Sequence, residues 1–275
     1  MNNSTSSPRL VFADDGTDAS DQVWNWIASH RWPGWHVDVM TADADLSHVD
    51  WGKPITPKVW EPTWDRDTSG LESKEVRFLS AAADPRAMLA EIHADLVALG
   101  IKSSGPLAAA VTGSTTEWLL HHPPSPLAII KRSEPVRRVL VCVDGSSHAN
   151  RALQTFASLP LAAGCTVVVL TVDDGRAKTS AADEAADTLQ GRVSEVTAVT
   201  SSGRPTQAIL NGAGDAQADL IVLGTRGLTG WKRLRLGSTA SAVVRSTSCD
   251  TLVACVDDSE RARSGSEPPS DLGLE

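Results

Sequence analysis

The residues best suited to bind a ligand lie toward the C-terminal end, in a glycine-rich stretch that follows a short aliphatic run. Gly224 and Gly227 come after the run 220–223, and Gly237-Ser238-Thr239 opens a helical pattern. A buried strand, a glycine loop and a helix start present backbone N–H groups with the positive end of the helix dipole behind them. The pattern therefore predicts a phosphate-binding site built mainly from the main chain.

This stretch is locally cationic within an acidic chain. No Asp or Glu occurs from Leu220 to Cys249, although the whole chain carries a net charge of -9. The basic residues there are Arg226, Lys232, Arg233, Arg235 and Arg245. Their charge favours an anionic ligand, although glycine-rich turns also serve as purely structural connections in α/β folds.

Other chemistries lack the residues that they require. The chain contains no Gly-x-x-x-x-Gly-Lys-Ser/Thr, His-Glu-x-x-His or Gly-x-Ser-x-Gly sequence, and Gly212-Ala213-Gly214 is not followed by the third glycine of a dinucleotide fingerprint. The glycine loop also has no acid or histidine to act as a general base. These features favour a binding protein over an enzyme.

Composition and charge limit the kinds of partner and the cellular compartment that we expect for this chain. A pI of about 5.2 argues against a nucleic-acid-binding face, and no apolar run is long enough to span a bilayer. The polar residues 1–8 lack the pattern of a secretion signal, so we expect a cytoplasmic protein with no membrane partner.

The four cysteines form no Cys-x-x-Cys pair, and three lie in or beside apolar runs. Buried, reduced thiols are therefore expected rather than a metal site.

Strand and helix patterns alternate along the chain, which predicts an α/β fold with parallel sheets covered by helices on both faces. The expected strands are 9–13, 35–41, 75–79, 94–100, 126–130, 138–143, 165–172, 193–200, 219–223 and 251–256. The expected helices are 20–30, 84–93, 113–120, 147–158, 181–190, 205–211 and 238–246. The segment 42–73 fits neither pattern and carries Trp51, Trp60 and Trp64.

The order of elements occurs twice, which indicates an internal duplication. Asp15-Gly16 matches Asp144-Gly145 after a first strand, and Gly113-Ser114-Thr115 matches Gly237-Ser238-Thr239 before a last helix. We expect duplicated domains at 9–131, with the insertion 42–73, and at 137–257, joined by a linker at 132–136. Residues 1–8 and the acidic tail 258–275 are expected to be disordered.

Gly224-x-x-Gly227, nine further residues and Gly237-Ser238 resemble the ATP-binding signature of universal stress proteins, and Asp144 is similar to their adenosine-side aspartate. The resemblance implies two tandem five-stranded Rossmann-like domains of the adenine nucleotide alpha hydrolase-like type, paired through their last strands, with further homodimerisation as an option. It also implies ATP as the ligand, with or without Mg²⁺. The implied binding residues are Val143, Asp144, Val172, Leu223, Gly224, Arg226, Gly227, Gly237, Ser238 and Thr239. Arg226 replaces the histidine more common at that place, and either adds charge to the phosphate site or faces solvent.

The first repeat departs from this signature. Gly100 and Gly113 keep the outer spacing, but the middle glycine has moved to Gly105 and the basic residues are reduced to Lys102. Ala42 stands where Val172 stands in the second repeat. We therefore expect the first repeat to bind ATP weakly or not at all.

The leading hypothesis is an ATP-binding sensor or regulator of the stress response that acts on an unidentified protein partner. The alternatives are a protein-interaction module, in which the tryptophan-rich insertion does the work beside a vestigial site, and a slow ATPase.

Overall fold

The computed structural model describes residues 7–42, 58–59, 66–81, 88–89, 92, 94–101, 118–120, 123, 125–175, 177–225 and 236–254. Trp51, Trp60, Trp64 and the C-terminal residues from 255 onward lie outside the described residues. The same holds for most of the helix expected at 84–93, of which Met88 and Leu89 are helical, and for the start of that at 113–120. Among the described residues, no helix is both long enough and apolar enough to cross a membrane.

The second half of the chain alternates strands and helices as predicted. Its elements are β7 (Arg138–Cys142), α4 (Ser147–Ser158), a 3-10 turn η3 (Pro160–Gly164), β8 (Thr166–Asp173), α5 (Ala181–Leu189), β9 (Glu195–Ser202), α6 (Pro205–Asp215), β10 (Leu220–Gly224), α7 (Ser238–Ser246) and β11 (Asp250–Ala254). Pro205 is the first residue of α6, where its fixed φ suits a helix start.

The first half follows the same order with two departures. Its described elements are β1 (Arg9–Asp14), α1 (Asp18–Ala28), β2 (Trp32–Ala42), β3 (Lys58–Val59), β4 (Ser73–Ala81), β5 (Leu96–Gly100) and β6 (Leu127–Ile130). β2 begins at Trp32, earlier than predicted, because Trp32 already pairs with Ser73 before a register shift that ends at His36. The insertion contributes β3, which pairs antiparallel with β4.

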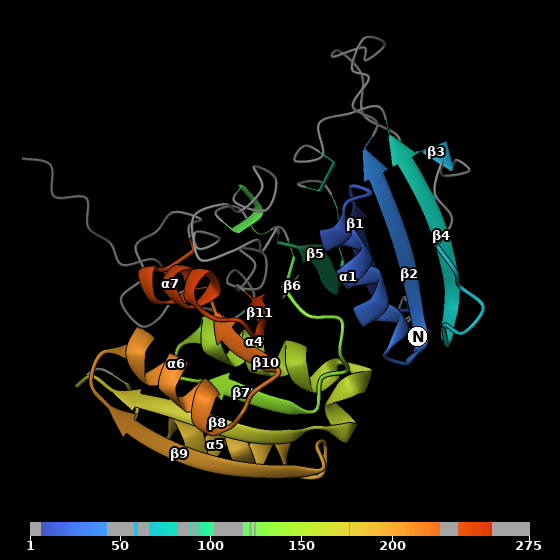
Figure 1. Cartoon of the computed structure of the whole chain (residues 1–275). Helices are drawn as coiled ribbons and strands as arrows, with labels where there is room; N and C mark the ends of the chain where they lie inside the picture. The colour runs from blue at the N-terminus through green and yellow to red at the C-terminus, as the bar shows by residue number, and fades with distance from the viewer. Residues whose placement is uncertain are drawn as a thin grey trace, which may run out of the picture.

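All the strands form one sheet, in the order β3-β4-β2-β1-β5-β6-β11-β10-β7-β8-β9 (Figure 1). In each half the first strand lies between two others, since β1 lies between β2 and β5, and β7 lies between β8 and β10. Neighbouring strands are parallel except in the pairs β3–β4 and β6–β11. The repeated strand order agrees with a duplication, while the domain boundaries at 9–131 and 137–257 stay a prediction.

The two halves join where β6 pairs antiparallel with β11, as expected for their last strands. Ala128 lies opposite Leu252, and Ile129 lies opposite Thr251. Because this pair is antiparallel, the parallel strands of the first half end at the opposite edge of the sheet from those of the second. Any ligand sites at the strand ends of the two halves would therefore lie on opposite sides of the molecule.

Helices cover both faces of the sheet, as predicted. On one face α1, α4 and α5 bury a cluster that includes Phe12, Val141 and Val169. On the other face α6 and α7 cover alternate residues of the same strands, such as Leu140 and Leu170. Strands buried on both sides read as continuous apolar runs, which is why the sequence pattern found them.

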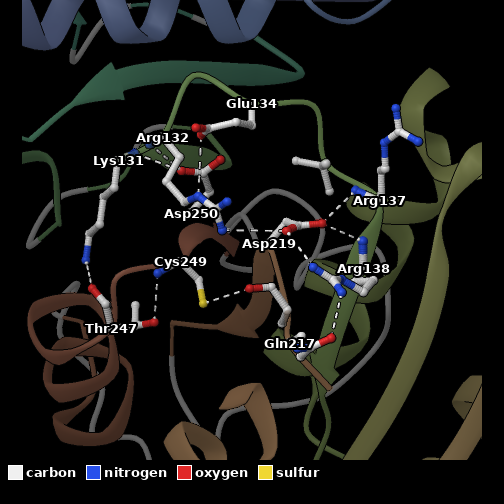
Figure 2. Close-up of polar contacts among 12 residues, drawn as sticks. Lys131, Arg132, Glu134, Arg137, Arg138, Gln217, Asp219, Thr247, Cys249 and Asp250 are labelled. Atoms are coloured by element: carbon white, nitrogen blue, oxygen red, sulfur yellow. Dashed lines mark hydrogen bonds and ion pairs between the residues drawn. The ribbon is translucent and has the colours of Figure 1, made fainter. Parts of the chain in front are cut away.

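Hydrogen bonds hold the linker between the halves against the second half (Figure 2). The Asp219 carboxylate accepts N–H groups from Arg137 and Arg138, at 3.0 and 2.9 Å. The Asp250 carboxylate accepts those of Lys131 and Arg132, at 2.8 and 3.1 Å. The segment 131–138, which contains the predicted linker 132–136, is therefore hydrogen-bonded at one end to Asp250 and at the other to Asp219. We call this segment the strap.

The charge of Asp250 makes this strap sensitive to pH. Burial raises the pKa of the Asp250 carboxyl to about 7, against the opposing effect of its N–H donors and of Arg132 and Lys131. The folded protein thus retains a proton there that the unfolded chain releases near its ordinary pKa of 3.8. The contribution of the Asp250 carboxyl to the free energy of unfolding is therefore fully present below pH 3.8 and is lost as the pH rises through 7.

We predict that Asp250→Asn, which keeps an acceptor for the two N–H groups, removes this pH dependence. From pH 5 to pH 8, the free energy of unfolding should fall by about 3 kcal/mol more in the parent than in the variant, because the folded carboxyl keeps its proton over about two of these pH units and one unit corresponds to about 1.4 kcal/mol. Denaturant unfolding at both pH values measures this. Identical pH dependence in the two proteins would contradict it.

Candidate functional site

The candidate site lies where the strand order reverses in the second half. β7 lies between β10 and β8, and the chain leaves it by α4 on one face and returns to β10 by α6 on the other. Connections that part in this way leave a crevice beyond the carboxyl ends of the two central strands. The residues predicted to bind a ligand lie at these ends.

Asp144 is held in a tight turn between β7 and α4. Its Oδ1 accepts the Ser146 N–H at 2.9 Å, and Gly145 adopts a φ of +85°, which favours glycine. Ser146 then caps α4 by accepting the Ala149 N–H at 3.2 Å. Within the described residues, the Asp144 carboxylate accepts this one hydrogen bond, and the residue is half-buried, so acceptor capacity remains for a ligand.

The predicted apolar contacts divide between the two faces of the sheet. Val172 and Leu223 belong to the core cluster on the α6–α7 face, whereas Val143 packs on the opposite face with α4. All three are less than a tenth exposed. The structure therefore places Val172 and Leu223 on the same face of the sheet and Val143 on the other.

Gly224 has a packing reason for being glycine that the motif alone did not reveal. A Cβ built there would lie 2.6 Å from the Ala149 nitrogen and 2.6 Å from the His148 carbonyl carbon. Gly100 repeats this arrangement in the first half, where a Cβ would lie 2.6 Å from the Ala19 oxygen. Gly100 lets β5 approach the first turn of α1, and Gly224 lets β10 approach the first turn of α4.

Thr225 and His148, which the sequence analysis missed, fix the ends of the glycine loop. The Thr225 carbonyl accepts the Gly237 N–H at 2.6 Å, and the Thr225 N–H donates to the Ala254 carbonyl at 2.9 Å. The Thr225 hydroxyl is hydrogen-bonded to His148 Nδ1 at 3.1 Å, and both side chains are buried. A hydroxyl directly after the strand, inside the glycine motif, was the available signal for Thr225.

The first turn of α7 has the chemistry to bind an anion. Gly237 is the N-cap residue and has no side chain to cap the helix, and the first turn contains no acidic residue. The early N–H groups of a helix have no intrahelical partner, and the dipole makes this end positive. Ser238 is exposed and Thr239 is half-buried, while Arg226 and Gly227 lie outside the described residues.

The equivalent turn in the first half is occupied by its own side chains. The strand registers place Asp14 where the second half has Val143. The buried Asp14 carboxylate accepts Arg66 Nε at 2.9 Å and Nη2 at 3.0 Å, and Arg66 also pairs with Asp21. Arg66 comes from the insertion and lies over the Phe12 ring, with 5.9 Å from its guanidinium carbon to the ring centroid.

Asp15, the counterpart of Asp144, is also engaged. Its Oδ1 accepts hydroxyl hydrogen bonds from Thr17 and Ser20, both at 2.6 Å. In the second half the residue that corresponds to Ser20 is Ala149, which has no hydroxyl. The first-half carboxylate is therefore committed to internal hydrogen bonds.

The thiols in the described part of the chain are structural. Cys142, Cys165 and Cys249 are free and buried, as the sequence predicted. Burial raises the pKa of Cys142 and of Cys165 to about 12, so neither forms a thiolate near neutral pH. No group of three or more His, Cys, Asp or Glu placed to hold a metal ion occurs among the described residues.

Comparison with known proteins agrees with this architecture. The model of the universal stress protein family matches residues 135–254. A universal stress protein from Thermus aquaticus is 32% identical over 133 residues, which cover 42% of this chain and 97% of that protein.

Two solved structures extend the likeness over both halves. A universal stress protein from Archaeoglobus fulgidus DSM 4304 has a TM-score of 0.62 at 20% identity and covers 91% of this chain and 97% of its own. A protein of unknown function from Pseudomonas aeruginosa PAO1 has a TM-score of 0.58 at 17% identity, covering 92% and 94%. The chain shares their fold, and by its sequence match it belongs to the universal stress protein family.

Proposed function

We propose that the second half binds ATP at the carboxyl ends of β7 and β10, and that the chain acts as a nucleotide-dependent sensor or regulator of the stress response. One observation carries the proposal. The hydrogen bond from the Gly237 N–H to the Thr225 carbonyl holds the uncapped start of α7 beside the end of β10. A triphosphate there would receive the first-turn N–H groups and the positive end of the helix dipole.

The adenosine would lie on the Asp144 side of the crevice. The Asp144 carboxylate is suited to accept ribose or base N–H and O–H groups, and Val172 and Leu223 offer an apolar wall on the α6–α7 face. Gly237, Ser238 and Thr239 would hold the phosphates, joined by Arg226 and Gly227.

α7 offers a physical route from this site to the seam between the halves. Lys131 Nζ donates to the carbonyl of Thr247, the C-cap residue of α7, at 2.6 Å (Figure 2). It also donates to the Val244 carbonyl in the last turn of α7, at 2.5 Å. Lys131 directly follows β6, the strand that joins the first half to β11. A nucleotide that favours one position of α7 would thereby favour one arrangement of the strap, which is what a sensor requires.

We predict that Gly237→Glu weakens ATP binding at least tenfold, or about 1.4 kcal/mol. Gly237 has φ −61° and ψ 158°, a backbone conformation that any residue adopts, and a carboxylate at a helix start is favourable for the helix. The variant should fold while its negative charge occupies the place of the phosphates. Isothermal titration with ATP measures the change.

Gly214→Glu is the matched control, because Gly214 is exposed on α6 and a Cβ there meets nothing within 4 Å. It should bind ATP like the parent. If Gly237→Glu also keeps the parent affinity, with a parent-like far-ultraviolet spectrum, the site is placed wrongly.

We further predict one ATP per chain, because Arg66 and the Asp15 hydrogen bonds occupy the equivalent turn of the first half. Gly113→Glu, the counterpart of Gly237→Glu, should change neither affinity nor stoichiometry in the same titration. A parent stoichiometry of two that Gly113→Glu halves would show that the first half binds nucleotide after all.

A further inference from the structure

The outer edge of β9 is an unprotected strand edge. Among the described residues β9 pairs on one side only, with β8, and it forms the lower rim of the second half in Figure 1. Edge strands are usually guarded by charged residues or proline. From Val196 to Ser202 this strand contains neither, and Val199, at 42% exposure, is the exposed large hydrophobic residue of the described chain.

The first half of the same molecule covers the equivalent edge with a strand. β3 runs antiparallel to β4, with Val59 opposite Leu79 and Lys58 opposite Ser80. Leu79 pairs with Met40 on β2, and Val199 pairs with Leu170 on β8. Because Met40 and Leu170 occupy equivalent places beside the first strands, Leu79 is the counterpart of Val199.

In the first half, the counterpart of this edge thus pairs with an antiparallel strand. We propose that a second copy of the chain supplies such a strand to β9, so that two β9 strands pair antiparallel about a twofold axis at Val199. Val199 would face its own copy in the partner, as Val59 faces Leu79. Ala198 would face Thr200, as Lys58 faces Ser80.

The chemistry of β9 suits pairing with itself. Antiparallel partners that lie directly opposite have side chains on the same face of a sheet, as Leu252 and Ala128 do at the seam between the halves. Pairing centred on Val199 satisfies this rule. Thr197 would then lie opposite Ser201, so every directly opposed pair from 197 to 201 is uncharged, and β-branched residues meet at the axis.

The covering helix also leaves room for a partner. α5 packs on both β8 and β9, so two α5 helices would lie about two strand spacings apart, roughly 10 Å. That separation is close to the usual distance between packed helices. The proposed pairing does not involve the nucleotide site and stands or falls separately from it.

Sedimentation equilibrium of the full-length chain at physiological ionic strength tests the proposal. The parent should reach twice its chain mass of 29.0 kDa at micromolar concentration. Val199→Lys places like charges opposite each other at the axis and should raise the dimer dissociation constant at least tenfold. Thr166→Lys, at an exposed position one strand inward, is the matched control and should dimerise like the parent.

Cysteine cross-linking tests the register. Val199→Cys should give a disulfide-linked dimer under mild oxidation, because residues directly opposite have Cβ atoms about 5 Å apart. Thr197→Cys, on the same face of β9, should not, because the two copies would be about 13 Å apart. The parent under the same oxidation measures the background from its own cysteines. A monomeric parent, a fully dimeric Val199→Lys variant or equal cross-linking of the two cysteine variants would each overturn the proposal.

Discussion

The contact on which the candidate site depends is the close approach of β10 to the first turn of α4. Gly224 permits it, since a Cβ would lie 2.6 Å from the Ala149 nitrogen. The approach brings Thr225 beneath α4, where its hydroxyl meets His148, and sets its carbonyl to receive the Gly237 N–H. The start of α7 and the Asp144 turn are thereby held at one end of the sheet, which is the geometry that the proposed ATP site requires.

Comparing the two halves distinguishes contacts that the fold requires from residues that could serve a ligand. Gly100 approaches Ala19 as Gly224 approaches His148, so this contact is common to both halves and is structural. The surrounding residues differ. Arg66 fills the turn beside Asp14 in the first half, whereas the second half has Val143 there and keeps the start of α7 uncapped. The two halves thus share one backbone arrangement but carry different side chains at the turn that follows their first strand.

Most of the succession of strands and helices along the chain could be predicted from the sequence, because apolar runs such as that of β8 and the paired Asp-Gly turns are local signals. Contacts between distant residues could not. Arg66 meets Asp14 across 52 positions, and Thr225 meets His148 across 77. The motif placed Val143 beside the ligand, although its side chain packs on the opposite face from Val172 because side chains alternate along a strand. The insertion lacks a periodic pattern, so neither β3 nor Arg66 could be placed.

Hydrogen exchange of the full-length chain, with and without ATP, tests the central claim most directly. We predict that ATP slows exchange of the backbone amides of residues 238–240 and 143–146, with a smaller effect across the strap at 131–138 that Lys131 ties to α7. Unchanged exchange at 238–240 under conditions where ATP is bound would contradict the account, because the nucleotide would then lie elsewhere.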